Sequence, residues 1–277
     1  MQEQSIPYQT SVINYHYLVR GARLVVCFHG YDEDGGDFHL MRDLLPADCS
    51  ILSIDLPYHG KTEWSASDRL DVTGMYDLID RISKRHFTNI VSIEFVGFSM
   101  GGRVALAMME RPARTITHIT LLAPDGLVVN PWYWFATGTA PGRWLFRFTV
   151  RNPGWFFMVL KLARAFGVVN LSVYKFTRHF LSTESLRWLL YNRWISMRWF
   201  RPKLNMVQKR IIAEKIPVLM LYGNYDRIMP AASGQRFCRA LNGLCHVEVM
   251  STGHQILQPK NKKHLLDIFR TRMPRWS

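Results

Sequence analysis

The chain has 277 residues, and its 35 Lys and Arg residues outnumber its 21 Asp and Glu residues, which gives a formal net charge of +14. This length suits one large domain with an insertion, and the 48% hydrophobic and 13% aromatic content excludes a disordered chain. The four cysteines, Cys27, Cys49, Cys238 and Cys245, form no CxxC pair, which argues against both a disulfide framework and a cysteine metal site.

Two features of the sequence bear on the compartment. The first ten residues are polar and lack the basic and apolar regions of a signal peptide. No window of eighteen uncharged apolar residues is present, so no segment is expected to span a membrane. We therefore expect a protein of the reducing cytoplasm.

Strands alternate with helices along most of the chain. Apolar and polar positions alternate at residues 11–19, which predicts a strand near a sheet edge. A continuous apolar run at residues 24–28 predicts a strand buried on both faces, and further strands are expected at residues 51–54, 93–96, 116–122, 218–222 and 246–250. Helical patterns fill residues 70–85 and 101–110. This order predicts an α/β fold with a doubly wound, mostly parallel sheet, whose functional residues follow the carboxyl ends of the strands.

The composition changes sharply between residues 126 and 210. This segment holds fourteen basic residues against one acid, Glu184, and seven of the nine tryptophans. We therefore expect a core domain formed by residues 1–125 and 211–277, with a basic, Trp-rich helical cap inserted at residues 126–210.

Three helices are expected within this cap. Asn152 and Pro153 are typical of a helix N-terminus and predict a helix over residues 155–166. A second helix is expected over residues 182–200. Three arginines at i, i+4 and i+8 predict one basic helix face: Arg143, Arg147 and Arg151.

The string GFSMGG at residues 97–102 matches GxSxG and lies between a buried strand and a helix pattern. In this motif the serine occupies a strained strand-to-helix turn, which needs glycine-like residues two positions before and after it. The turn would expose the Ser99 hydroxyl as a nucleophile. It would also place the Met100 N–H at a helix N-terminus, where it could bind a developing oxyanion.

Two further motifs fit the same chemistry. His29 and Gly30 follow the first buried strand and match an HGx stretch, in which the next residue, Tyr31, supplies a second oxyanion N–H. Asp226 and His254 each follow one of the last two strands. A histidine in this position can take the serine proton as a general base, and the aspartate can fix its tautomer.

These motifs together resemble the α/β-hydrolase superfamily, in particular its serine hydrolases with a helical cap. The string DLPYHGKT at residues 55–62 is similar to the DxPGHGxS stretch of that superfamily, although Tyr58 stands where a glycine is usual. The resemblance covers nearly all of the chain outside the cap. It implies catalytic roles for Ser99, Asp226 and His254, with backbone oxyanion donors at Tyr31 and Met100. A serine at position 99 argues against the dehalogenases and epoxide hydrolases of this fold, which use an aspartate there.

Two assignments stay open at this point. Asp125 follows the strand at residues 116–122, where some hydrolases carry the acid, although the GxxDxxxP context favours Asp226. Arg103, directly after the elbow glycines, resembles the arginine by which a menaquinone-pathway lyase binds a substrate carboxylate. A surface ion pair explains Arg103 equally well.

The charge of the cap predicts an anionic partner. Fourteen cations repel one another unless anions are near, and Trp together with Arg and Lys on short helices is typical of membrane-surface binding. Nucleic acid is not expected, since the sequence has no recognised binding module. Trp132 and Trp144 are candidate substrate-binding residues in the cap. We expect contact with the anionic inner membrane face.

The sequence thus predicts a serine hydrolase that cleaves a carboxylic ester or thioester of an amphiphilic acyl or lipid substrate, without metal or cofactor. The alternative is a menaquinone-type lyase that eliminates pyruvate from a carboxylate-rich substrate. A binding protein that keeps the elbow but has no activity is a third hypothesis.

Overall fold

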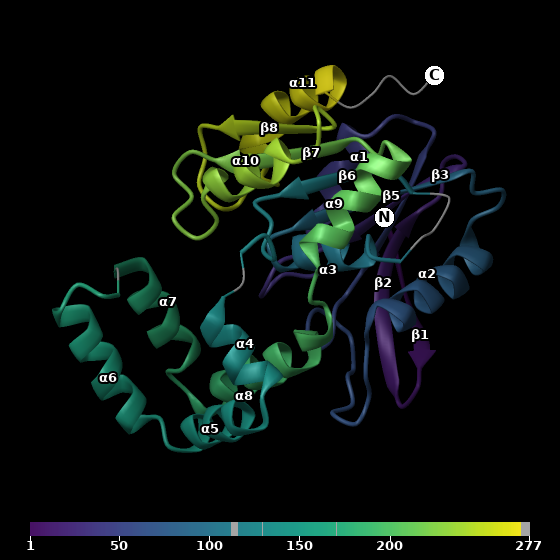
Figure 1. Ribbon diagram of the computed structural model, residues 1–277. Helices are drawn as coiled ribbons and strands as arrows, with labels where there is room; N and C mark the ends of the chain where they lie inside the picture. The colour runs from purple at the N-terminus through teal and green to yellow at the C-terminus, as the bar shows by residue number, and fades with distance from the viewer. Residues whose placement is uncertain (112–115, 129, 170, 273–277) are drawn as a thin grey trace. The chain divides into compact units, whose positions relative to one another are not determined.

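In the computed structural model, which describes residues 1–111, 116–128, 130–169 and 171–272, one eight-stranded sheet is formed by the described residues (Figure 1). Its strand order is β1-β2-β4-β3-β5-β6-β7-β8. The strands are β1 (Gln2–Tyr8), β2 (Ser11–Leu18), β3 (Arg23–Phe28), β4 (Cys49–Ile54), β5 (Ser92–Phe98), β6 (Ile116–Leu122), β7 (Val218–Gly223) and β8 (Cys245–Met250).

The sheet is mostly parallel, as the sequence predicted. β3, β4, β5, β6, β7 and β8 pair in parallel, with Phe28 opposite Gly97 and Phe98 opposite Leu122. β1 and β2 form an antiparallel hairpin, and β2 is antiparallel to β4. Because β3, β5, β6, β7 and β8 run in one direction, their carboxyl ends share one edge of the sheet, and the loops that follow them meet there.

The sequence reading missed β1. The polar residues that made this segment unlike a signal peptide form an edge strand whose residues Ile6 and Tyr8 are buried while their neighbours are exposed. Gln9, with φ of 52°, forms the turn into β2. One buried face is enough to hold an edge strand, so the segment lacks a continuous apolar run.

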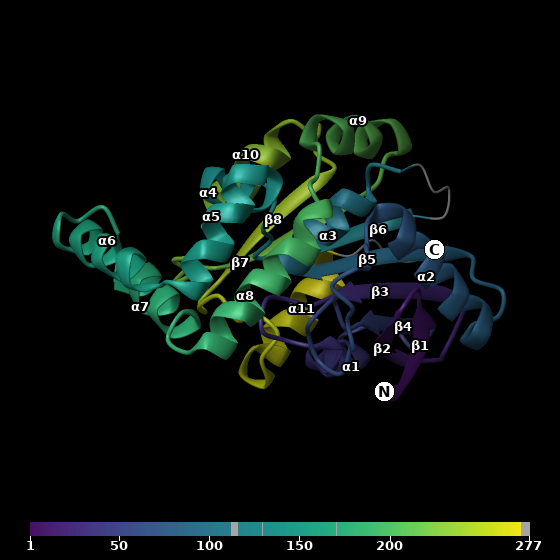
Figure 2. The same ribbon diagram turned by 90° about the horizontal axis from the view of Figure 1, so that it is seen from below.

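The helices of the core pack on both faces of the sheet. They are α1 (Met41–Leu44), α2 (Val72–His86), α3 (Met100–Met108), α9 (Leu204–Glu214), α10 (Ala231–Arg239) and α11 (Lys262–Arg272), with short 3₁₀ helices η1 (Gly35–Leu40) and η3 (Pro259–Asn261). α3 and α9 lie side by side on one face, and α1 and α11 lie side by side on the other (Figure 2). The helices expected at residues 70–85 and 101–110 correspond to α2 and α3.

The described chain divides into two compact units. Unit 1 comprises Met1–Val128 and Trp199–Ser277, and unit 2 comprises Val129–Arg198. Unit 2 is thus shorter than the expected cap at residues 126–210, because α9 belongs to unit 1. Arg210 on α9 is buried and donates a hydrogen bond to the Met109 carbonyl at 3.1 Å. Val207 and Ile211 on the same helix are also buried.

Unit 2 is helical. Its described helices are α4 (Pro131–Gly138), α5 (Ala140–Arg151), α6 (Gly154–Ala165), α7 (Leu171–Phe180), α8 (Glu184–Ser196) and the 3₁₀ turn η2, Met197–Trp199, which crosses into unit 1. Asn130 and Thr183 cap α4 and α8 with their side chains. The predicted N-cap at Asn152 is wrong: this residue ends α5, and Pro153 precedes α6 without a side-chain cap bond.

The three arginines expected on one helix face do lie on α5, but their surroundings differ. Arg143 is half-buried and donates to the Thr137 carbonyl at 3.4 Å, which helps to end α4. Arg147 and Arg151 are exposed and lie 6.0 and 5.9 Å from the ring centre of Trp188 on α8. Only two of the three are therefore surface cations.

Two further observations concern the cysteines and the membrane. Cys238 and Cys245 are joined by a disulfide bond between the end of α10 and the start of β8, whereas Cys27 and Cys49 are buried thiols. The sequence predicted a protein of the reducing cytoplasm, in which the cysteines would be reduced, and this disulfide bond differs from that expectation. Among the described residues, no helix combines the length and the apolar character needed to cross a bilayer.

Candidate active site

The strand-to-helix turn at Ser99 has the strained geometry that the GxSxG motif predicts. Ser99 has φ of 48° and ψ of −114°, between the end of β5 and the first residue of α3. A side chain at Gly101 would collide with the Phe28 carbonyl at the end of β3, and one at Gly97 would meet the Gly101 carbonyl. The Ser99 N–H donates to the Leu122 carbonyl at 2.9 Å, so β6 holds the turn in place. Contacts with the neighbouring strands thus hold Ser99 in its strained backbone conformation.

Ser99, His254 and Asp226 form a continuous hydrogen-bonded chain within unit 1. The His254 Nε2 atom lies 3.0 Å from the Ser99 Oγ atom. The His254 Nδ1 atom lies 2.7 Å from the Asp226 Oδ2 atom. The three residues come from loops after β5, β8 and β7, which end at the same edge of the sheet. This is the relation of a nucleophile, a base and a group that orients the base.

The surroundings of Asp226 fix the proton positions in this chain. Burial opposes ionisation of Asp226, but hydrogen bonds from His254 and from the backbone N–H groups of Met229 and Ile228 outweigh it and lower the pKa of its carboxyl. An ionised carboxylate only accepts hydrogen bonds, so His254 Nδ1 carries the proton and donates it. The Nε2 atom is then left as an acceptor for the Ser99 hydroxyl, which is the orientation that base catalysis requires.

Asp125, the alternative acid, has a different partner. Its Oδ2 atom lies 3.3 Å from Nη1 of Arg103, and its N–H donates to the Ser99 carbonyl at 2.9 Å. The Arg103 side chain is only 10% exposed, so this is not the surface ion pair considered from the sequence. The structure therefore brings Asp226 to His254 and Asp125 to the first turn of α3. Asp125 lies three residues before the end of the first stretch of unit 1.

The two expected oxyanion donors follow the same edge of the sheet as Ser99. Met100 is the first residue of α3, and Tyr31 lies two residues beyond the buried His29 that follows β3. The close approach of Gly101 to the Phe28 carbonyl brings the N-terminus of α3 to the end of β3. The backbone N–H groups of both residues therefore belong to the same edge of the sheet as the Ser99 hydroxyl.

His29 anchors the loop that carries Tyr31. Its Nδ1 atom donates to the Gly30 carbonyl at 2.7 Å, and its Nε2 atom accepts the Leu56 N–H at 2.9 Å. Burial lowers the pKa of this fully buried imidazole, which favours the neutral form that can donate at one nitrogen and accept at the other. The HGx histidine thus sets the orientation of the peptide between Gly30 and Tyr31.

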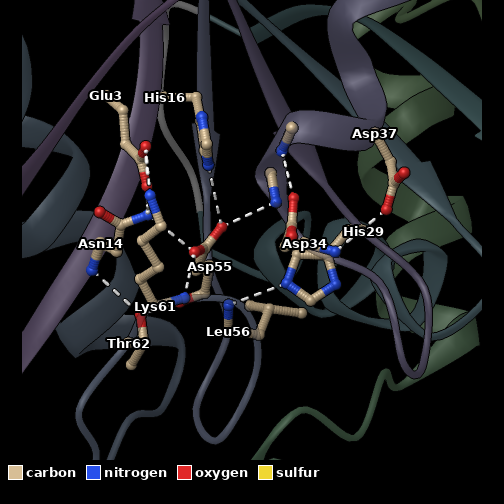
Figure 3. A network of polar contacts seen from close by, with 12 residues as sticks. Glu3, Asn14, His16, His29, Asp34, Asp37, Asp55, Leu56, Lys61 and Thr62 are labelled. Carbon is tan, nitrogen blue, oxygen red and sulfur yellow. Dashed lines mark hydrogen bonds and ion pairs between the residues drawn. The ribbon is translucent and has the colours of Figure 1, made fainter.

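Asp55 lies at the centre of a polar network beside the loop after β3 (Figure 3). Its carboxylate accepts hydrogen bonds from Gly35 N–H, Lys61 N–H and Asn14 Nδ2 at 2.7, 2.9 and 2.8 Å. Burial opposes its ionisation, but these bonds and the neighbouring His16 lower its pKa to about 2. The first residue of the DxPGHGxS-like stretch thus ties together β2, the loop after β3 and the turn after β4.

This region also holds the group of side chains most similar to a metal site within the described chain. Atoms of His16, Asp34 and Asp55 lie within 4.8 Å of one another, a cluster that sequence spacing did not reveal. The Asp55 oxygens already accept three hydrogen bonds, and Asp34 Oδ1 accepts the Gly36 N–H at 2.7 Å as the cap of η1. These carboxylate oxygens are thus already used to hold the loops, an arrangement that fits loop anchoring rather than metal binding.

The departure at position 58 has a structural reason. Tyr58 takes φ of 63°, the left-handed conformation for which the superfamily stretch usually has a glycine. The following residue, His59, is buried and donates a hydrogen bond from Nδ1 to the Pro57 carbonyl at 2.9 Å. Its ring packs against His29 and Tyr31. Tyr58 thus carries a large side chain at a position whose backbone conformation glycine adopts most readily.

Glu33 is a residue of this site that the sequence reading missed. Its Oε2 atom accepts the Gly30 N–H at 2.9 Å, and its Oε1 atom accepts from Gln255 Nε2 at 2.7 Å. Burial raises the pKa of the Glu33 carboxyl, although both hydrogen bonds act in the opposite direction. The only available signal was an acid three residues after the glycine of HGx, within a run of three acidic loop residues. Asp32, by contrast, is exposed.

The two tryptophans proposed to bind substrate belong to unit 2. Trp132 lies in the first turn of α4 and Trp144 lies on α5, and both are exposed. The Trp144 ring stacks on Phe148 one helical turn later. The interactions that assemble Ser99, His254 and Asp226 lie within unit 1 and do not involve either tryptophan.

Comparison with known proteins identifies the family to which this fold belongs. Residues 23–257 match the alpha/beta hydrolase fold family. The chain is 22% identical over 254 residues to the uncharacterized hydrolase YugF of Bacillus subtilis, covering 91% of this chain and 89% of that protein. It is 36% identical over 87 residues to the 2-succinyl-6-hydroxy-2,4-cyclohexadiene-1-carboxylate synthase of Citrobacter koseri, covering 31% of this chain and 32% of that enzyme. A thermophilic esterase from Thermogutta terrifontis has a similar structure, with a TM-score of 0.64, 18% identity and coverage of 98% and 97%. The chain therefore belongs to the alpha/beta hydrolase fold family of enzymes.

Proposed function

We propose that this enzyme is a serine hydrolase that cleaves a carboxylic ester or thioester through a covalent acyl-enzyme. One observation carries the proposal: Ser99 Oγ, His254 and Asp226 are linked by contacts of 3.0 and 2.7 Å, with the serine at a strained elbow. The hydroxyl is the nucleophile, the imidazole is the base and the carboxylate is the group that orients it.

The reaction proceeds in two halves. Ser99 Oγ attacks the acyl carbonyl carbon while His254 Nε2 takes the hydroxyl proton, and the Tyr31 and Met100 N–H groups bind the oxyanion. Return of the proton to the leaving oxygen or sulfur breaks the bond to the acyl carbon and leaves the acyl group on Ser99. Water then gives a proton to His254 and attacks the same carbon. The bond from this carbon to Ser99 Oγ breaks as His254 returns the proton to Oγ, which releases the carboxylic acid and restores the serine.

The composition of unit 2 supports an amphiphilic acyl substrate. This unit contains six of the seven tryptophans of the expected cap segment and a single acid, Glu184, among its many cations. Aromatic side chains bind acyl chains by burying apolar area, and cations favour an anionic head group. The substrate we propose is therefore an acyl ester or thioester with an apolar chain and a polar or negatively charged part.

A fluorophosphonate probe tests the chemistry directly. The wild-type protein should gain one covalent adduct on the peptide that carries Ser99, and the Ser99→Ala variant should gain none. A panel of acyl esters and thioesters of increasing chain length should then identify the acyl preference. A protein that the probe does not label, and that hydrolyses no member of the panel, would be the binding protein without activity.

The similarity to the Citrobacter koseri synthase, together with Arg103, favours one second candidate. The alternative reaction is elimination of pyruvate from a carboxylate-rich cyclohexene. Arg103 would then contribute its guanidinium to a substrate carboxylate, in competition with Asp125 at 3.3 Å. Release of pyruvate from such a substrate, with no hydrolysis across the acyl panel, would favour the lyase over the hydrolase.

A further inference from the structure

Unit 2 exposes more apolar surface than its size would suggest. Eleven of the twenty large hydrophobic side chains that the described residues expose belong to this unit, which forms about a quarter of the chain. They lie on α4, α5, α6, α7 and the segment between α6 and α7. Single exposed hydrophobic residues are ordinary in proteins, but contiguous groups mark a surface that binds something apolar.

Five of these side chains lie along one face of α6. We call this group the α6 stripe, and its members are Trp155, Met158, Val159, Leu162 and Phe166, which are between 37% and 81% exposed. Their spacing of i, i+3, i+4, i+7 and i+11 places all five on one side of a helix with 3.6 residues per turn. Phe166 directly follows the last residue of the helix.

The face of α6 away from the stripe is already used. Leu160 is buried there, and α6 packs beside α7, so that the two helices form a hairpin in both views of the chain (Figures 1 and 2). The exposed stripe and the buried Leu160 thus lie on different faces of α6, and the helix also exposes Lys161 and Arg164. An exposed apolar stripe on a helix that also carries cations is typical of a helix at a lipid surface.

The charge of the unit identifies the kind of surface. Residues 129–198 contain ten Lys and Arg residues and one acid, Glu184, which lies at the start of α8. On the hairpin itself, Lys161, Arg164, Lys175 and Arg178 are exposed. An apolar stripe with a tryptophan at one end, on a hairpin that also exposes four cations, complements a bilayer with anionic head groups, because the stripe enters the acyl boundary while the cations stay in water.

From this pattern we infer that unit 2 docks on an anionic lipid bilayer through the α6 stripe, with the exposed cations of the hairpin attracted to the head groups. The docking is a binding property of unit 2 and does not depend on which reaction Ser99 performs. If the proposed hydrolysis holds, docking also brings the enzyme to the membrane surface where amphiphilic acyl substrates are concentrated.

The test measures binding of the full-length Ser99→Ala protein, which cannot consume the lipid, to vesicles. One set of vesicles is phosphatidylcholine alone, and the other is an equal mixture of phosphatidylcholine and phosphatidylglycerol. Co-sedimentation should show binding to the anionic vesicles that exceeds binding to the neutral ones, and added salt should weaken it, since exposed charges are screened over about 10 Å at 0.1 M.

Two triple variants separate the apolar and the charged contributions. Met158→Gln, Leu162→Gln and Phe166→Gln together should lower partitioning onto anionic vesicles at least about tenfold, because each removes apolar area that enters the lipid. Lys161→Gln, Lys175→Gln and Arg178→Gln together should lower it by roughly a hundredfold, since each cation near an anionic surface contributes about fivefold. All six residues are partly or fully exposed, so the fold should tolerate them, which circular dichroism and thermal melting check.

Matched substitutions in unit 1 provide the controls. Val19→Gln, Val91→Gln and Met206→Gln change side chains of comparable exposure, and Arg85→Gln, Arg236→Gln and Lys263→Gln remove three exposed cations. Both control proteins should partition like the parent. Unchanged binding in the stripe variant, or equal binding of the parent to neutral and anionic vesicles, would overturn the inference. So would a parent dimer in analytical ultracentrifugation that the stripe variant dissociates, because the stripe would then be covered by a second copy.

Discussion

The Glu33 carboxylate accepts a hydrogen bond from the Gln255 side chain at 2.7 Å, although the two residues are 222 positions apart in the chain. Gln255 directly follows His254, and the second Glu33 oxygen holds the Gly30 N–H at 2.9 Å. One carboxylate therefore connects the loop that carries the expected Tyr31 oxyanion donor to the loop that carries the base. Its position fixes two parts of the site relative to each other.

Replacing this carboxylate should impair catalysis without impairing substrate binding. In Glu33→Gln only one side-chain oxygen remains, so either Gly30 or Gln255 loses its acceptor. We expect kcat to fall roughly tenfold to a hundredfold, because a misaligned oxyanion donor acts on the transition state and not on the bound substrate. KM should change less than threefold. Steady-state kinetics on the best ester from the panel measures both values.

Gln255→Ala is the matched control for this change. It removes the link to the His254 loop but keeps the Glu33 bond to the Gly30 N–H, so its loss in kcat should be smaller than that of Glu33→Gln. A Glu33→Gln enzyme with unchanged kcat, or with a loss that lies only in KM, would contradict the positioning role.

Ser99→Ala should abolish turnover and leave the fold intact. Loss of the nucleophile removes the covalent route, with an expected decrease in kcat of roughly 10⁴-fold or more. The residue is half-exposed, and alanine meets the same backbone strain at φ of 48°, so the melting temperature should stay within a few degrees. More than a few per cent of residual hydrolysis in the purified variant would show that Ser99 is not the nucleophile.

Asp226→Asn should be far more damaging than Asp125→Asn. The amide can donate to His254 Nδ1 and so stabilise the wrong tautomer, for which a loss of roughly 10⁴ in kcat is expected. Asp125 is paired with Arg103, and its replacement should cost less than tenfold in kcat while lowering the melting temperature. Kinetics and melting curves of both variants provide the comparison, and a larger kinetic loss at position 125 would reverse the assignment of the acid.

A buried acid in the core predicts a pH dependence of stability that is separate from catalysis. Glu94 on β5 is 1% exposed, and burial raises its pKa to about 7, although Arg23 at 3.1 Å opposes the shift. Between about pH 4.5 and pH 7 the folded state therefore holds a proton that the unfolded chain releases, so the contribution of Glu94 to stability decreases as the pH rises.

Urea unfolding at several pH values tests this prediction. The difference in unfolding free energy between wild type and Glu94→Gln should fall by up to about 3 kcal/mol from pH 4.5 to pH 7.5. The glutamine retains an oxygen for Arg23 but cannot ionise. The contribution of the buried His118, whose pKa is lowered to about 4 by burial, is present in both proteins and cancels in the difference. A difference that is constant with pH would show that Glu94 is ionised throughout.

Much of this site could be read from the chain because its signals are local. The elbow needs glycines two positions on either side of Ser99, because neighbouring backbone segments come into contact at these positions. The apolar runs of β3 and β7 follow from burial of these strands on both faces. The composition of unit 2 was equally evident, but its boundary was not, since α9 resembles the cap in charge and differs from it only in the surface on which it packs.

Only the tertiary structure could decide the partners of the polar side chains. His254 lies 28 positions from Asp226 and 155 from Ser99 in the sequence, and Asp125 stayed an alternative acid although the local context favoured Asp226. Glu33 and Asp32 are neighbours of the same charge, yet one joins two loops and the other is exposed. Hydrogen bonds require contact within about 3 Å, and that contact depends on strand order, register and loop packing. The sequence therefore determined which chemical groups follow each strand, whereas the meeting of those strands at one edge of the sheet decided which groups could act together.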